Sequence, residues 1–116
     1  MSLAKIKFTQ KLLKEKFGVK GIVAGRYLEA GYHVKVDYVT SKGKVDIYAI
    51  KENDKFAIKV IEKNTLVTVD EVKDLVEKAK TLNAKPVLIL YGSGPKLTDE
   101  ILRAINELNV KIRRMR

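Results

Sequence analysis

The sequence predicts an α/β fold in which a mixed β-sheet carries helices on its faces. Two observations lead to this prediction. Segments with apolar residues at helical spacing alternate with short runs rich in β-branched residues, and three of those runs follow one another with only short polar turns between them. The predicted order is helix, helix, three strands, helix, strand, helix, strand, which suits a mixed sheet flanked by helices.

Two helices are predicted at the start of the chain. The first has Ser2 as its N-cap and Gly18 as its stop. Its apolar residues fall at helical spacing and are Ile6, Leu12, Leu13 and Phe17. A shorter helix is predicted from about residue 20 to residue 30, ended by Gly31.

Three strands then form a predicted antiparallel meander. Apolar and polar residues alternate over 32–38, which predicts a strand with Tyr32 and Tyr38 on its buried face and His33 on its polar face. Residues 45–50 and 56–61 read as the second and third strands, with polar turns at 41–43 and 51–54.

The second half of the chain predicts a helix, a strand, a helix and a strand. Thr68 and Glu71 have the spacing of a capping box before the apolar stripe of the third helix. Glu71 and Asp70 are explained by this capping and by the helix dipole. Pro86 opens a buried strand over 87–90, and 92–95 form a loop. Thr98 caps a last helix that runs to residue 108, and 110–113 are a final strand.

Composition limits the classes of protein to which the chain can belong. Its 116 residues fit one domain over 1–116, and its 46% apolar residues suffice for one core. No apolar run approaches the roughly 20 residues of a membrane span, so a cytoplasmic protein without a membrane partner is expected. The absence of cysteine excludes disulfides and thiolate chemistry, and the single histidine, His33, excludes multi-histidine metal sites. The Lys- and Glu-rich composition is compatible with a thermophilic source.

The net charge of +10 points to a polyanionic partner. The positive charges gather at the two ends of the chain, whereas residues 68–81 are nearly balanced. Such basic clusters are typical of proteins that bind nucleic acid, so a nucleic acid, with DNA as the main candidate, is the predicted partner.

Two short segments resemble a known nuclease family. Residues 25–32, GRYLEAGY, and 43–49, GKVDIYA, resemble the PD-(D/E)xK nuclease superfamily, which has a restriction-endonuclease-like fold, and within it the archaeal Holliday-junction-resolvase-like and RecB-like branches. In that family a strand bears an Asp before apolar residues, and the next strand bears Glu-x-Lys. The helix, strand and helix that follow match too, so the resemblance covers most of the chain from about residue 20.

The resemblance implies a site at which Asp and Glu hold a divalent metal ion and Lys assists. Asp46 fits the first position. A turn at 51–54 pairs Ile50 with Lys55, Tyr48 with Ala57, and Asp46 with Lys59. The family's Glu would then fall at Lys59 and its Lys at Ile61, and an upstream helical Glu would fall near Gly21. Only Asp46 remains of the family's set, so the expected site is degenerate.

Lys59 is expected to pair with Asp46 and to take the metal ion's electrostatic place. A displaced motif made by Glu62 and Lys63 is the alternative, and it requires a β-bulge to rotate Glu62 back toward Asp46. The plainer interpretation of Glu62 is a solvated strand end.

The predicted function is a non-catalytic nucleic-acid-binding domain without a cofactor, for which the resemblance implies junction or duplex DNA and a homodimer. Its candidate phosphate contacts are Lys5, Lys7, Lys11, Lys14, Lys42, Lys44, Lys59, Arg113 and Arg114. Two alternatives stay open. One is a Mg²⁺-dependent endonuclease or Holliday junction resolvase, with Asp46 and Glu62 as metal ligands and Lys63 assisting. The other is a pseudoenzyme protein-interaction subunit that pairs with an active relative.

Overall fold

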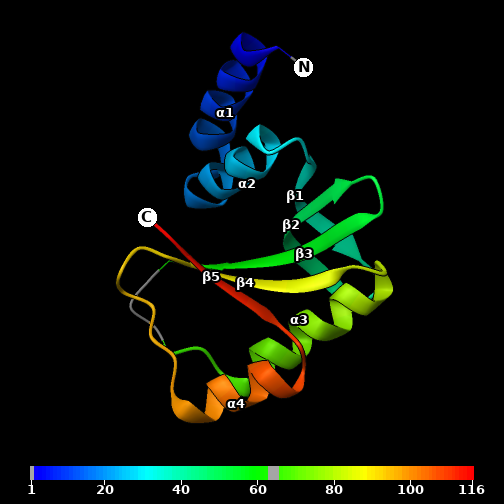
Figure 1. The fold of residues 1–116 in the computed structure, drawn as a ribbon, viewed down its shortest axis with the longest axis vertical. Helices are drawn as coiled ribbons and strands as arrows, with labels where there is room; N and C mark the ends of the chain where they lie inside the picture. Colours follow the sequence, from blue (N-terminus) through cyan, green and yellow to red (C-terminus); the bar gives the residue numbers. More distant parts are fainter. Residues whose placement is uncertain (1, 63–65) are drawn as a thin grey trace.

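A computed structural model describes residues 2–62 and 66–116 (Figure 1). Its helices are α1 (Leu3–Phe17), α2 (Val19–Glu29), α3 (Val69–Thr81) and α4 (Asp99–Glu107). Its strands are β1 (His33–Thr40), β2 (Gly43–Lys51), β3 (Asp54–Ile61), β4 (Lys85–Tyr91) and β5 (Lys111–Met115). The order of elements is the one the sequence predicts. Lys63 lies outside the described residues.

The five strands form one mixed sheet in the order β1-β2-β3-β4-β5. The first three pair antiparallel, and β3, β4 and β5 run parallel, so the predicted meander and mixed sheet are confirmed. Between β2 and β3, Ile50 lies opposite Lys55 and Tyr48 opposite Ala57, as the hairpin register predicts.

Helices cover both faces of the sheet. Figure 1 shows α1 and α2 on one side and α3 and α4 on the other. Ile47 and Ile58 of the sheet pack in one core with Val23 of α2. Leu75 of α3 and Ile105 of α4 belong to the core on the other face of the sheet. The predicted α/β class, with helices flanking a mixed sheet, is confirmed. Within the described residues, no helix is long and apolar enough to cross a membrane.

Helices α1, α3 and α4 begin at the predicted caps. The hydroxyls of Ser2, Thr68 and Thr98 each accept a hydrogen bond from a backbone N–H three residues later, at 3.2, 3.2 and 3.3 Å. Gly18, with φ +61°, separates α1 from α2. A left-handed backbone of this kind favours glycine, which explains the predicted stop.

Helix α1 packs on α2 at very short range. Gly21 lies against the backbone of Leu13, and a Cβ at this position would come within 1.9 Å of the Leu13 carbonyl oxygen. Gly25 lies against Gln10, whose side-chain amide donates to the Gly25 carbonyl at 2.9 Å. Leu12, which the sequence places on the buried stripe, is 48% exposed because α1 contacts α2 along one side only.

The face alternation of β1 breaks at Asp37, whose φ is +54°. Val36 packs on the α2 side, yet Tyr38, two residues later, packs on the α3 side. An unbroken strand would place both on one face. The prediction that Tyr32 and Tyr38 share a face is therefore wrong, although both are partly buried.

Candidate functional site

The strands β2 and β3 separate at Asp46. Their ladder ends at the pair Ile47–Ile58, so the predicted pairing of Asp46 with Lys59 is not formed. One carboxylate oxygen of Asp46 instead accepts the backbone N–H of Val60 at 2.8 Å. In a continued register this N–H would face the backbone of β2. The Asp46 side chain thus replaces a strand as the hydrogen-bond partner where the two strands part.

On the neighbouring strand β1, the carboxylate of Asp37 is paired with an ammonium group. Lys20, in the first turn of α2, places its Nζ 2.6 Å from a carboxylate oxygen of Asp37, and Lys44 lies 3.7 Å from the same oxygen. Asp37 is opposite Asp46 in the extended β1–β2 register, which neither residue joins as a ladder pair. The break in β1 at Asp37 therefore lies next to the separation of β2 and β3 at Asp46.

The electrostatics of this point centre on Lys20. The pKa of Lys20 is raised above its ordinary value, first by the hydrogen bond to Asp37 and further by the negative charges of Asp46 and Glu62, against the opposing effect of burial. The same hydrogen bond is the main cause that lowers the pKa of the Asp37 carboxyl. Three carboxylates thus raise the pKa of one ammonium group.

Lys59 does not have the expected role. Among the described residues, the ion pairs within 4.0 Å do not include one between Lys59 and Asp46, so the expected pair is wrong for this geometry. Lys59 lies on the strand face that points toward α3, and Asp46 is bound by Val60. Ile61, at the position of the family's Lys, packs against the α3 and α4 core.

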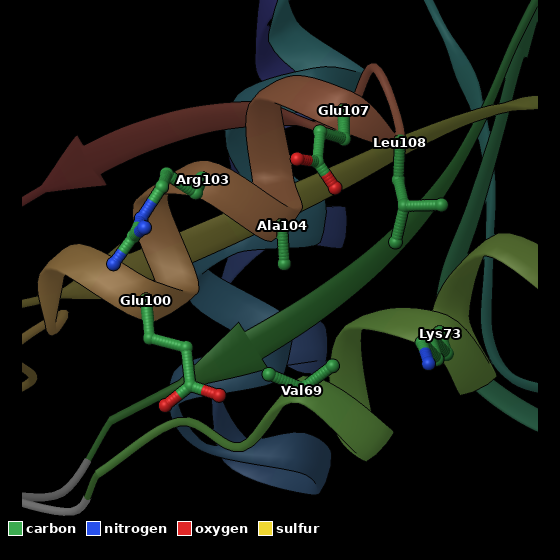
Figure 2. A pocket seen from close by; sticks show the side chains of 7 residues that line it. All are labelled: Val69, Lys73, Glu100, Arg103, Ala104, Glu107 and Leu108. Carbon is green, nitrogen blue, oxygen red and sulfur yellow. The ribbon is translucent and has the colours of Figure 1, made fainter.

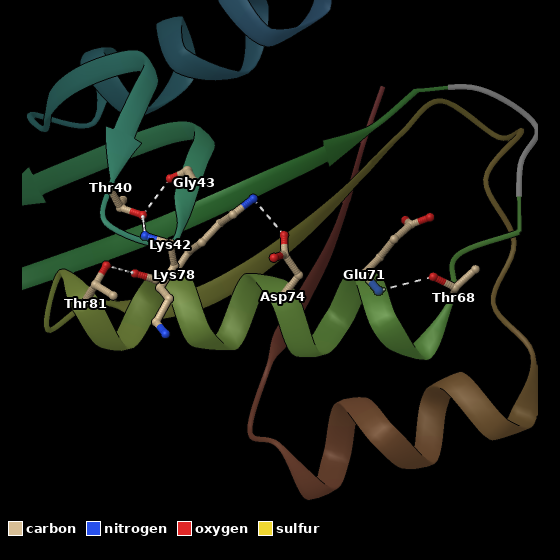
Figure 3. A network of polar contacts seen from close by, with 8 residues as sticks. All are labelled: Thr40, Lys42, Gly43, Thr68, Glu71, Asp74, Lys78 and Thr81. Carbon is tan, nitrogen blue, oxygen red and sulfur yellow. Dashed lines mark hydrogen bonds and ion pairs between the residues drawn. The ribbon is translucent and has the colours of Figure 1, made fainter.

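On the α3 side the site is closed by a second ion pair. Lys78 and Asp74, one turn apart on α3, are 2.7 Å from each other (Figure 3). They line a hollow of only about 20 Å³ together with Lys44, Asp46 and Lys59. This volume holds at most one water molecule. The β1–β2 turn, held by the hydrogen bond of the Thr40 hydroxyl to the Gly43 carbonyl, lies beside the same part of α3 (Figure 3).

These residues do not fit a divalent metal ion. One oxygen of Asp46 accepts the Val60 N–H, Asp37 is paired with the ammonium of Lys20, and Asp74 is paired with that of Lys78. Within the described residues no three His, Cys, Asp or Glu side chains converge to hold a metal ion. A divalent ion beside Lys20 would meet repulsion of a few kcal/mol at an effective dielectric constant of about 20.

The position of the family's upstream acid is closed by packing. The sequence places it near Gly21, and the contact with Leu13 leaves no room for any side chain there. The neighbouring residue is Lys20, so α2 presents a cation where the resemblance implies an acid. Two adjacent residues of α2 therefore have different roles: Gly21 allows α1 to pack closely, and Lys20 provides the positive charge at the site.

Glu62 and the other predicted acids are placed as follows. Glu62 follows the last residue of β3 and is exposed, and its charge reaches Lys20. Asp70 and Glu71 lie in the first turn of α3, where the Glu71 N–H binds Thr68 (Figure 3). His33 is exposed at the start of β1, as predicted.

The nine candidate phosphate contacts lie in three separate places. Four exposed lysines lie along α1, and three more surround the β1–β2 turn and the α3-facing side of β3. Of the two arginines on β5, Arg114 donates hydrogen bonds to the carbonyls of Gly92 and Pro95, whereas Arg113 is exposed. The guanidinium of Arg114 is thus already engaged in holding the loop before α4.

A broad hollow of about 500 Å³ lies between α3 and α4 and contains none of the predicted site residues (Figure 2). Lys73 and Arg103 alternate there with Glu100 and Glu107 around Val69. This mixture of charges gives the hollow no net preference for an anion or a cation.

Sequence reasoning missed Lys20 and Asp37 as members of the site. Lys20 immediately precedes Gly21, the position of the expected helical acid, and this neighbourhood was the available signal for it. Asp37 interrupts a run of β-branched and aromatic residues, and aspartate is both depleted in strands and tolerant of a positive φ. That interruption was the available signal for a break in β1.

Comparisons with known proteins bear on the fold and the family of the chain. No curated protein matches the sequence. A protein of unknown function has a similar structure, with a TM-score of 0.63 and 16% identity over 80% of this chain and 54% of that one. A repair endonuclease from Pyrococcus abyssi follows with a TM-score of 0.61 and 13% identity over 94% and 46%. The EndoMS structure in complex with double-stranded DNA has a TM-score of 0.59 and 14% identity over 75% and 37%.

At these identities the solved structures show the fold alone, and the chain spans about half the length of the first of them or less. The sequence profile of the PD-(D/E)XK superfamily domain matches residues 22–111, which include β1 to β4 and the Asp46 site. The chain therefore belongs to the PD-(D/E)XK superfamily.

Proposed function

We propose that this chain is a non-catalytic member of the nuclease superfamily that binds DNA through its basic surface. The observation that carries the proposal is the ammonium of Lys20, 2.6 Å from Asp37 and under the influence of Asp46 and Glu62. A cation belonging to the chain thus pairs with the carboxylate that lies opposite Asp46 in the β1–β2 register, and of the family's metal-binding set only Asp46 is present. In this proposal the chain keeps the family's binding to the DNA phosphate backbone and does not cleave it.

Helix α1 is the best placed of the three basic groups for that contact. Its lysines are all exposed, and among the described residues none of them forms an ion pair within 4.0 Å. The helix stands away from the sheet at one end of the molecule (Figure 1). Free exposed lysines release counterions from DNA on binding, which supplies affinity without sequence specificity.

The solved structures support DNA as the class of ligand. A repair endonuclease and a protein bound to double-stranded DNA share this fold. In the chain itself, the net charge of +10 supplies the long-range attraction that such a ligand needs.

Fluorescence anisotropy with duplex, four-way-junction and single-stranded DNA tests the proposal. Affinity should fall steeply between about 50 mM and about 200 mM salt, by about a thousandfold if six phosphates are contacted. Replacing four α1 lysines by glutamine (Lys5, Lys7, Lys11 and Lys14) should weaken binding and flatten this salt dependence. The matched control replaces four exposed cations on the α3 and α4 side, which are Lys73, Lys80, Lys96 and Arg103; it lowers the net charge equally and should weaken binding clearly less than the α1 variant does. Affinity that does not change with salt would refute the proposal.

A metal-dependent nuclease is the second candidate function, because Glu62 and Asp46 act on the same ammonium. In this alternative Asp46 and Glu62 are the metal ligands, and Lys63, which lies outside the described residues, assists. Incubation of DNA with Mg²⁺ or Mn²⁺ separates the two functions. The non-catalytic proposal expects no cleavage, whereas cleavage that disappears in Asp46→Asn would establish the nuclease. Tight association with an active relative and no retention of DNA at low salt would favour a protein-interaction subunit instead.

A further inference from the structure

A second hollow, away from Asp46, lies between the last turns of α2 and the edge strand β5. Its volume is about 370 Å³. Helix α2 packs mainly on β1, β2 and β3, and this leaves the α2 side of the sheet open next to β5. None of Lys20, Asp37 and Asp46 lines this α2–β5 hollow, so it is separate from the site described above.

The inner part of the α2–β5 hollow is aromatic. Tyr27, Tyr32 and Phe56 form a cluster in which the Tyr27 and Tyr32 rings meet edge to face at 5.5 Å, and the Phe56 ring lies 5.7 Å from Tyr32. Tyr27 is buried, while Tyr32 and Phe56 are half-buried and line the hollow. Rings fixed by one another in this way offer a planar ligand a preformed surface.

The rim of the α2–β5 hollow is cationic. Arg26, Lys111 and Arg113 stand around it, all exposed, and no acidic residue is among the described residues that line it. Arg113 lines the hollow together with Tyr27. Burial raises the pKa of Tyr27, and the charge of Arg113 opposes this rise. Arg26 is held in position by a hydrogen bond to the Arg116 carbonyl at 2.6 Å.

We propose that the α2–β5 hollow holds a single unpaired nucleotide, with its base against Tyr32 and Phe56 and its phosphate beside Lys111 and Arg113. The combination of an aromatic surface and a cationic rim is the one that single-stranded nucleic acid requires. The volume lies near the lower end of the range of about 300 to 1,000 Å³ for small-ligand sites, which suits one nucleotide and excludes a base pair.

This inference rests on the proposed DNA binding and deepens it, because it gives the chain a preference for DNA with a free end or a flipped-out base. Duplex contacts by α1 position the chain, and the hollow captures one nucleotide that has left the stack. Stacking of one base on an aromatic side chain corresponds to an affinity gain of about five- to hundredfold.

The test compares a blunt duplex with the same duplex carrying one unpaired fluorescent adenine analogue as an overhang, using the full chain. We expect the overhang to bind about five- to hundredfold more tightly and its fluorescence to be quenched by stacking. Phe56→Leu should reduce both the quenching and the gain in affinity, because only Tyr32 remains for stacking, and should leave blunt-duplex affinity unchanged. Lys111→Gln should reduce the gain, and the control Lys73→Gln, on α3, should not.

The outcomes separate the two proposals. If the blunt duplex binds and the overhang adds neither affinity nor quenching, the α2–β5 hollow is not a nucleotide site, while the proposed DNA binding stands. A gain that survives both Phe56→Leu and Lys111→Gln refutes the hollow as well. If neither DNA binds at low salt, both proposals fail. Lys111 is exposed, so Lys111→Gln keeps the test valid if Phe56→Leu does not fold.

Discussion

Replacing Asp46 by alanine should destabilise the fold, because its carboxylate holds the point where β2 and β3 separate. The carboxylate accepts the Val60 N–H at 2.8 Å, and Val60 is only half-exposed. A hydrogen bond to a charged group contributes about 1.5 to 3 kcal/mol, and an unsatisfied donor costs a similar amount. We therefore expect Asp46→Ala to lower the free energy of unfolding by about 2 kcal/mol. Asp46→Asn keeps an acceptor oxygen and should cost less than about 1 kcal/mol.

Urea unfolding followed by circular dichroism measures this difference. Asp46→Ala should lower the denaturation midpoint without changing the slope, because the loss is local and the surface exposed on unfolding is the same. Glu107→Ala, which removes an exposed acid from α4, is the control for net charge and should change stability by less than about 0.5 kcal/mol. If Asp46→Ala is as stable as the unchanged protein, or more stable, Asp46 has no structural role. Its carboxylate would then be free for a ligand.

Three further perturbations test the fold and the charges around the site. Gly21→Ala should destabilise the fold by about 3 kcal/mol or more in thermal unfolding, because its Cβ would come within 1.9 Å of the Leu13 carbonyl oxygen. Gly25→Ala meets only the flexible side chain of Gln10 and should cost clearly less. Equal losses of stability in the two variants would contradict this packing. Thr68→Ala should cost about 1 kcal/mol by removing the cap of α3, and Thr68→Ser should restore it. The lowered pKa of Asp37 means that its contribution is present above the ordinary carboxyl value of 3.8 and is lost as pH falls through the lowered value. Asp37→Asn should therefore lose up to about 1 kcal/mol at neutral pH and little in acid, and an equal loss at both would contradict the ion pair.

Much of the fold could be predicted from the sequence because its signals are local. The caps Ser2, Thr68 and Thr98 satisfy backbone groups within three residues, and hydrophobic periodicity needs only the next turn or the next strand position. The hairpin register around Tyr48 follows from the length of one turn. The exposure of Leu12 could not be predicted in this way, because it depends on how far α1 extends beyond its contact with α2.

The candidate site was predicted in part. Asp46 was identified from its strand, and the absence of the family's Glu and Lys from β3 follows from the register. The expected ion pair of Lys59 with Asp46 was wrong, because the described residues place no such pair within 4.0 Å and the close ion pair here joins Lys20 to Asp37. A residue pairing deduced from the hairpin register is correct only where the ladder continues. Here the ladder stops at Ile47, and beyond it the Asp46 side chain accepts the backbone N–H of Val60.

The sequence by itself determined the elements of this protein, their order, the sheet's mixed character and a positive charge that suits an anionic partner. Only the tertiary structure decided which charges meet. Lys20 and Asp37 are brought together by a helix that could approach α1 only through Gly21, and by a strand that twists at one left-handed residue. Local patterns are repeated along the chain and can be read from it, whereas a contact between distant residues depends on how every element between them packs.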